Sequence, residues 1–205
     1  MSEVFHHRFP TYDVLDKRNS PSWNDQTRAV VNKRLDEVPD RCFLTEAEWE
    51  ILVAVCNRLI PQPERVNRPV PIVPFIDEKL HKNQGDGYRY EGMPPMREAW
   101  RQGIKAIDEE ARARWGGGFR QLPHNQQDAV LRAIQHNDVR SKAWHALPAK
   151  QFFSSLLLRT AVSIYYAHPA AWSEIGFGGP ASPRGYVRLG FDRRDPWEAE
   201  ERHDG

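Results

Sequence analysis

The chain has 205 residues, which is enough for one globular domain with a buried core. Its 29 Lys and Arg residues balance 28 Asp and Glu residues, so the formal charge of +1 creates no field that would attract nucleic acid or anionic lipid. No apolar run is long enough to cross a bilayer. We therefore expect neither nucleic-acid binding nor direct membrane insertion.

The start of the chain bears on its location. The first ten residues include Glu3 and two histidines, where a secretory signal peptide would need a basic end and an apolar stretch. We therefore expect a cytoplasmic protein. The alternative is the periplasm, reached by export together with a partner.

Residues 1–44 are polar and interrupted by prolines, and only Gln26 to Leu35 has the spacing of a short helix. We predict an N-terminal arm that lies against another surface. Its aromatic side chains are spaced as contacts for that surface, and Trp23 is the partner-binding candidate among them.

The clearest helix is expected over about residues 46–60. Thr45 and Glu48 form a capping box, and apolar side chains follow at helical spacing until prolines end the pattern. After an extended, proline-rich stretch, a brief helix carrying Ile76 and Leu80 is expected.

A loop that begins at Gly85 leads to a long helix, whose apolar face runs from Met96 to Ala111. The glycines at 116–118 end this helix. They lack the spacing and the preceding strand of a dinucleotide-binding loop. A fourth helix is expected near Pro123, since proline suits the first helical position.

A fifth helix is expected from about Pro148 to Tyr166, where His168-Pro169 ends it. It is apolar on more than one face, so it should be central or covered on both sides. No alternating strand pattern of useful length is present. The predicted fold is all-α, a small bundle of about five helices over residues 45–169, with extended N- and C-terminal arms that wrap a partner.

Residues 170–205 are rich in glycine, proline and aromatic residues and have no period of either kind. Their large apolar side chains are too many to leave in water, so we predict a C-terminal wrapping segment ordered by a partner or by the helices. Aromatic and arginine side chains are the types enriched at the energetic centres of interfaces. The partner-binding candidates of this type are Trp172, Phe177, Tyr186, Arg188, Phe191 and Trp197.

One dense polar and aromatic cluster lies at an element boundary. It contains Tyr165, Tyr166 and His168. The structural interpretation is a helix end with tyrosines packed on the tail. The functional interpretation is that these partner-binding candidates face the active site of a partner. The remaining alternative is a small stand-alone enzyme that uses these groups for acid/base chemistry.

Other catalytic or metal-binding patterns are weak. There is no nucleophile-elbow, phosphate-loop or kinase signature, and the histidines lack the spacing of a metallohydrolase. Cys56 falls on an apolar helix face, as a free thiol would, and a bridge to Cys42 is the alternative. We expect no catalytic residue, cofactor site or metal site in this chain.

Several segments match a known family in their order and spacing. They are Leu44–Glu48, Val55–Pro61, Val73–Leu80, Trp100–Ala111, Gln127–Ile134, Phe152–Pro169 and Gly176–Gly179. Together they resemble the gluconate 2-dehydrogenase subunit 3 family, the small subunits of FAD-dependent sugar and polyol dehydrogenases. The resemblance covers about residues 43–180.

The resemblance implies an accessory, chaperone-like subunit that binds and stabilises a large flavoprotein of the glucose-methanol-choline (GMC) type. Oxidation of a sugar, glycoside or polyol and the FAD cofactor would belong to that partner, with a cytochrome c as a candidate electron acceptor. Many relatives begin with a twin-arginine export signal, which this chain lacks. A scaffold module that binds an unrelated protein is a further alternative.

Overall fold

The computed structural model describes residues 9, 12–65, 69–85, 87 and 89–182. In this part of the chain every regular element is helical and none is a strand, which confirms the all-α prediction. The described residues fall into two compact units. We call residues 39–164 the central unit, and the residues before 39 together with those from 165 on the terminal unit.

The central unit contains all five predicted helices. Its elements are α2 (Glu46–Leu59), η2 (Pro63–Arg65), α3 (Ile72–His81), α4 (Met96–Trp115), η3 (Phe119–Gln121), α5 (His124–Gln135), η4 (Lys142–Ala146), α6 (Ala149–Gln151), η5 (Phe152–Leu158) and the first part of α7 (Arg159–Ala167). The capping box at Thr45 and Glu48 is present as predicted. Helix α5 begins near Pro123 as predicted, although this proline is the N-cap and not the first helical residue.

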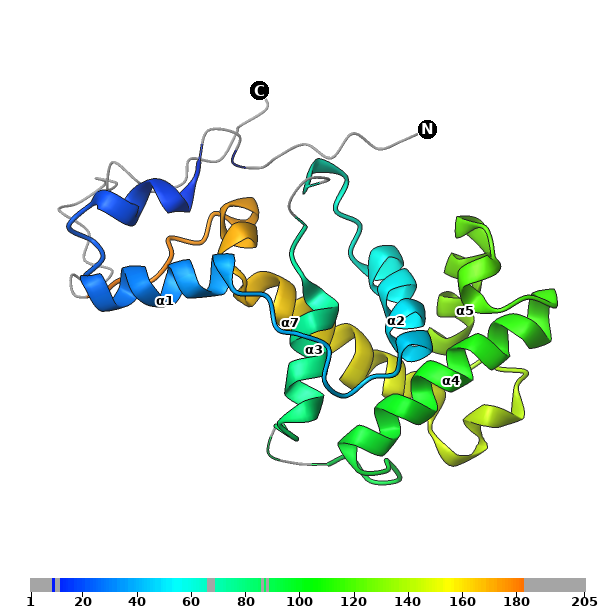
Figure 1. Ribbon diagram of the computed structural model, residues 1–205. Helices are drawn as coiled ribbons and strands as arrows, with labels where there is room; N and C mark the ends of the chain where they lie inside the picture. Colours follow the sequence, from blue (N-terminus) through cyan, green and yellow to red (C-terminus); the bar gives the residue numbers. More distant parts are fainter. Residues whose placement is uncertain (1–8, 10–11, 66–68, 86, 88, 183–205) are drawn as a thin grey trace. The chain divides into compact units, whose positions relative to one another are not determined.

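Helix α4 is the scaffold of the central unit, and α2, α5, η3, η4 and η5 all pack against it (Figure 1). Its apolar face buries Trp100, Ile104 and Ile107 completely or nearly so. The helix ends at Gly116, whose φ of 78° is the left-handed conformation that glycine adopts without strain. The C-terminal end of α4 could therefore be predicted from the sequence.

The fifth predicted helix differs from expectation in its middle, because Phe152–Leu158 forms a π-helix, η5, between α6 and α7. Phe152 packs edge-on against Trp100, with ring centroids 5.9 Å apart, and reaches α4 at Gly103. A Cβ atom on Gly103 would lie 2.1 Å from the Phe152 ring. The absent side chain therefore permits this close approach. As predicted, the segment is covered by more than one neighbour, since η5 packs against both α4 and α5.

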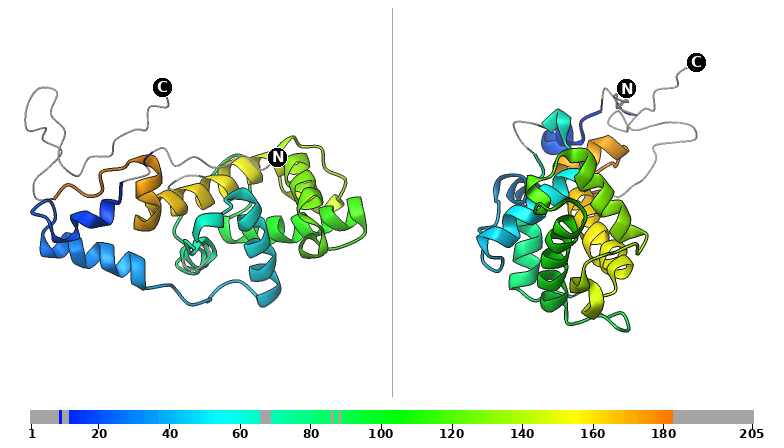
Figure 2. Two further views of the ribbon diagram at one scale, coloured as in Figure 1. Left: turned by 90° about the horizontal axis from the view of Figure 1, so that it is seen from above. Right: turned by 90° about the vertical axis from the view of Figure 1, so that its right-hand side faces the viewer.

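The terminal unit contains η1 (Val14–Asn19), α1 (Asp25–Asp36) and η6 (Pro169–Ile175). Helix α1 confirms the short helix expected in the N-terminal arm, whereas η1 and η6 lie in stretches without predicted helix. Both η1 and α1 pack against η6, as the blue and orange segments show in Figures 1 and 2. The side chains that form the small shared core are Val14, Trp23, Val31, Leu35 and Trp172.

Hydrogen bonds also join the two ends of the chain within the terminal unit. Trp23 Nε1 donates to the Pro180 carbonyl at 2.8 Å, and Lys17 Nζ donates to the Gly178 carbonyl at 2.6 Å. The described parts of the two predicted arms thus pack on each other. The segment limits 1–44, 45–169 and 170–205 rest on composition and stay a prediction, as does the wrapping of a partner.

Candidate functional site

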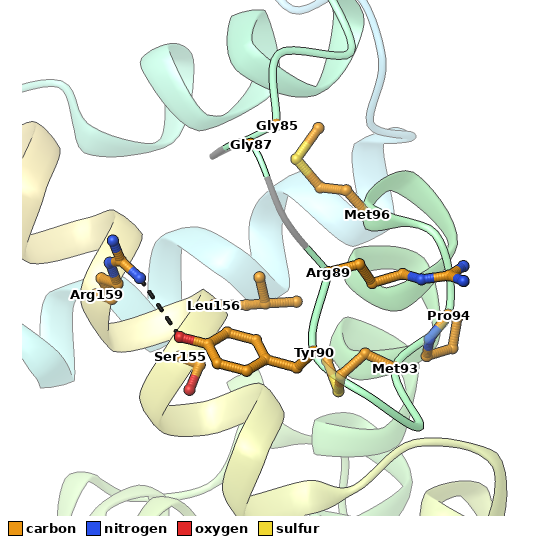
Figure 3. A pocket seen from close by; sticks show the side chains of 10 residues that line it. All are labelled: Gly85, Gly87, Arg89, Tyr90, Met93, Pro94, Met96, Ser155, Leu156 and Arg159. Carbon is orange, nitrogen blue, oxygen red and sulfur yellow. Dashed lines mark hydrogen bonds between the residues drawn. The ribbon is translucent and has the colours of Figure 1, made fainter.

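A cavity of about 410 Å³ lies in the central unit, between the loop before α4 and the helical segment η5–α7 (Figure 3). Its size is within the range of about 300–1,000 Å³ that is usual for ligand pockets. Most of the surface that faces it is apolar. The lining residues are Gly85, Gly87, Arg89, Tyr90, Met93, Pro94, Met96, Ser155, Leu156 and Arg159.

The loop side of the cavity is shaped by a tight turn. The Met93 N–H donates to the Tyr90 carbonyl at 3.1 Å, and Gly92 within this turn has a φ of 75°. The turn buries Met93 and leaves Met96 partly exposed at the first residue of α4. The sequence identified this loop only as a connection, although its glycines, methionines and tyrosine are the signal that could have indicated a site.

The helical side comes from the π-helix and the start of α7. Leu156 projects toward the loop, and Arg159 reaches across to Tyr90, whose phenol oxygen accepts a long hydrogen bond of 3.5 Å from Nη1 (Figure 3). A bond of this length contributes little by itself. The serine of this wall, Ser155, accepts a hydrogen bond of 2.8 Å from Gln151 Nε2.

Positive charge is present on both sides of the cavity. Arg89 comes from the loop and Arg159 from α7, and the described lining residues include no carboxylate. Arg89 is exposed and makes no ion pair with any described residue. The cavity thus combines apolar walls with two guanidinium groups, which suits an occupant with an apolar part and an anionic part.

The predicted cluster at the end of α7 has structural contacts in the terminal unit. The buried Tyr165 hydroxyl donates to the Glu174 carboxylate, with oxygen distances of 2.8 and 2.9 Å. His168 is buried as the N-cap of η6, where its Nδ1 accepts the Ala170 N–H at 3.3 Å. Tyr166 remains 41% exposed. These contacts agree with the structural interpretation of the cluster.

The other predicted partner-binding residues have different environments. Trp23 and Trp172 are buried in the core of the terminal unit. Phe177 is 38% exposed and packs edge-on against Trp172, with ring centroids 5.4 Å apart. Tyr186, Arg188, Phe191 and Trp197 lie outside the described residues. Partner binding stays a prediction for all ten residues.

Two fully buried carboxylates were missed by the sequence analysis. Asp77 on α3 accepts the backbone N–H groups of Cys42, Phe43 and Leu44 at 2.6–3.2 Å. These bonds fix the chain immediately before α2. No local pattern shows that an acid within a helix will serve as a cap for a segment more than thirty residues earlier.

The second buried carboxylate, Glu110 on α4, accepts the N–H groups of Arg140 and Ser141 at 2.8–3.0 Å. It also accepts a hydrogen bond of 2.7 Å from Arg114 Nε. The carboxylate therefore fixes the segment that leads into η4. Like Asp77, it serves the fold and does not face the cavity.

A smaller hollow of about 220 Å³ adjoins an ion pair between α2 and α5. Arg58 binds the Asp128 carboxylate with both Nε and Nη2, at 2.7 and 2.8 Å. The hydrogen bond from Arg58 is the main reason that the pKa of Asp128 lies below its ordinary value. The two partners satisfy each other, and the other polar side chains of this hollow, Arg132 and Gln135, are exposed to solvent.

The two cysteines are free thiols, with Cys42 exposed and Cys56 buried, so the alternative of a bridge between them is wrong. Burial raises the pKa of Cys56 to about 12. Among the described residues, no three His, Cys, Asp or Glu side chains gather as metal ligands would. The same part of the chain contains no helix that is long and apolar enough to span a membrane.

The comparisons with known proteins give one result. No curated protein and no solved structure matches the chain. A family model, gluconate 2-dehydrogenase subunit 3, matches residues 46–179. The match begins at the first residue of α2, takes in the whole cavity and ends shortly after η6. Since it spans more than half of the chain, this protein belongs to the gluconate 2-dehydrogenase subunit 3 family, whose name makes it a subunit of a dehydrogenase complex.

Proposed function

We propose that the chain is a non-catalytic accessory subunit that binds a larger FAD-dependent dehydrogenase of the GMC type and assists its folding and stability. The observation that carries the proposal is the family match over residues 46–179. The partner would oxidise a sugar, glycoside or polyol by hydride transfer to its FAD. This chain would supply binding surface and no reacting group.

The contacts of the α7 cluster support this division of labour. A general acid or base must be within reach of a substrate proton. His168 instead caps η6, and the Tyr165 hydroxyl donates to Glu174, so both groups are used inside the terminal unit. These contacts weigh against the alternative of a stand-alone enzyme at this place.

Exposed apolar side chains in the terminal unit support a protein partner. Val30 is 48% exposed, Ile175 is 50% exposed, and Tyr166 and Phe177 are also partly open to solvent. Such side chains contribute to protein interfaces when a partner covers them. An obligate complex of this kind would bury more than about 2,000 Å².

We also propose where the complex assembles and which protein accepts its electrons. Assembly with the flavoprotein would take place in the cytoplasm, and export of the finished complex to the periplasm is the alternative. A cytochrome c is the candidate electron acceptor. Neither the sugar nor the oxidised carbon follows from the residues of this chain.

Co-purification tests the proposal. The tagged chain and a flavoprotein encoded beside it should elute as one complex that carries flavin absorbance and oxidises a sugar or polyol. The flavoprotein made without this chain should be less soluble and less active. A chain that stays monomeric and cooperatively folded in the presence of the flavoprotein would refute the accessory role.

Two other outcomes of the same experiment would favour the alternatives. Turnover by the purified chain alone, lost on His168→Ala, would identify a stand-alone enzyme. A stable complex with another protein and no flavin absorbance would identify a scaffold module.

A further inference from the structure

The floor of the 410 Å³ cavity is apolar and adaptable. Met93 is buried beneath it, while Met96 and Leu156 are partly exposed toward it. Thioether side chains have several rotatable bonds and adjust to the shape of what they contact, which makes methionine frequent at binding surfaces. An open apolar hollow of this size is the default candidate for contact with another molecule.

The charges around the hollow restrict the chemistry of that molecule. Arg89 and Arg159 approach the cavity from the loop and from α7, and guanidinium groups pair best with carboxylates. The described lining residues include no carboxylate, and Arg89 makes no ion pair with a described residue. The occupant should therefore present a carboxylate beside an apolar group.

The wall of the cavity is an unusual element held in place from behind. The π-helix η5 presents Ser155 and Leu156 to the cavity, while Phe152 on its other side packs between Trp100 and Trp144. Short π-helical segments occur frequently at functional sites. The aromatic packing thus holds the helical wall of the hollow against α4 and η4.

The open side of the hollow favours a protein over a small molecule. Small-molecule sites enclose about 70–90% of their ligand. This cavity is only partly enclosed. A segment of a larger protein would itself cover the opening, since the body of the partner continues above the side chain that enters.

We propose that this cavity is the binding site for an apolar side chain next to a carboxylate, in an acidic segment on the surface of the dehydrogenase subunit. The apolar side chain would contact Met93, Met96 and Leu156, and the carboxylate would pair with Arg89. This inference rests on the proposed function and names the part of the central unit that engages the partner.

Two substitutions test the cavity without touching the core. Leu156→Trp fills the hollow from a partly exposed position, and Arg89→Glu reverses a charge that makes no ion pair with a described residue. Leu158→Trp is the matched control on the same π-helix, and Lys105→Glu is the matched control on the exposed face of α4; neither residue lines the cavity. All four variants are made in the full chain.

The affinity of each purified variant for the flavoprotein subunit is measured, together with its melting temperature. Each cavity variant should weaken binding by at least about tenfold with an unchanged melting temperature, because one interface anchor contributes at least about that factor. The controls should bind within about twofold of the wild type, as expected for surface changes outside an interface.

The outcomes separate this proposal from the accessory function. If the wild type binds the flavoprotein and both cavity variants bind equally well, the cavity proposal is overturned and the accessory function stands. Equal losses in the controls would overturn it as well, because the effect would not belong to the cavity. If the wild type does not bind, both proposals fail. A small molecule retained by the purified chain in native mass spectrometry, and lost in Leu156→Trp while the complex still forms, would also overturn it.

Discussion

Replacing Asp77 with asparagine should destabilise the central unit more than any change of one surface charge. The carboxylate accepts three backbone N–H groups: Oδ2 accepts that of Cys42 at 2.6 Å, Oδ1 accepts that of Leu44 at 2.7 Å, and both oxygens lie near the Phe43 nitrogen. Asparagine keeps the shape but replaces one oxygen with an NH₂ group. In either orientation of the amide, a donor would then face a donor.

The expected loss follows from these contacts. A hydrogen bond to a charged group contributes about 1.5–3 kcal/mol, and a buried N–H left without an acceptor costs about 1–3 kcal/mol. Asp77 is completely buried, so water cannot replace the lost acceptor at the carboxylate itself. We expect the free energy of unfolding to fall by about 3 kcal/mol, which is roughly a 100-fold change in the unfolding equilibrium.

Urea unfolding followed by far-UV circular dichroism measures this loss. Glu109→Gln is the matched control, because it removes one negative charge from an exposed position on α4 and should change stability by less than about 0.5 kcal/mol. A loss below about 1 kcal/mol for Asp77→Asn, or one equal to that of the control, would refute the assigned role of this carboxylate.

Two further predictions concern Gly103 and the cysteines. Gly103→Ala should destabilise the chain by about 1–3 kcal/mol despite the better helix propensity of alanine, because the new Cβ would meet the Phe152 ring; Phe152→Leu in the same chain should restore part of this loss in a double-mutant cycle. Iodoacetamide at about pH 8 should label Cys42 and spare Cys56 until the chain unfolds. Since burial raises the pKa of Cys56 from 9.0 to about 12, the unfolded chain releases this proton first, and stability should fall as the pH rises from 9 toward 12; urea unfolding of Cys56→Ala should lack this fall.

The helices of the central unit could be predicted because their signals are local. The capping box of Thr45 and Glu48 marks the start of α2, and the left-handed Gly116 marks the end of α4. Each signal lies within one turn of the boundary that it sets. Helix existence and position therefore followed from short stretches of sequence.

The π-helix could not be predicted because no local pattern distinguishes it from an α-helix. Within residues 152–158 the apolar pattern is that of any buried helix. The deviation accompanies the contact between Phe152 and Gly103, which are separated by almost fifty residues. The same holds for Asp77 and Glu110, whose backbone partners lie about thirty residues away.

The cavity could not be predicted from local sequence patterns either, although the residue types that line it could be seen in the sequence. Gly85, Tyr90 and Met93 stand in a loop, and Leu156 and Arg159 stand more than sixty residues later in a helix. Only the packing of the loop against η5 and α7 brings the two arginines to one hollow. Residue types alone could suggest a binding loop but not what it faces.

Aromatic side chains in the terminal segments show why contacts with a partner are harder to predict from sequence than helices are. Trp23, Trp172 and Phe177 have the same sequence character, yet the first two fill a core and the third is partly exposed. The family match ends at residue 179 and does not include η1 or α1, which complete the core around Trp172. Trp172, which lies within the matched residues, is thus buried by residues that lie outside the match. Contacts with a partner through Trp172 would require this core to open, whereas contacts through Phe177 would not. The exposure of each side chain in the folded unit therefore distinguishes residues that look equivalent in the sequence.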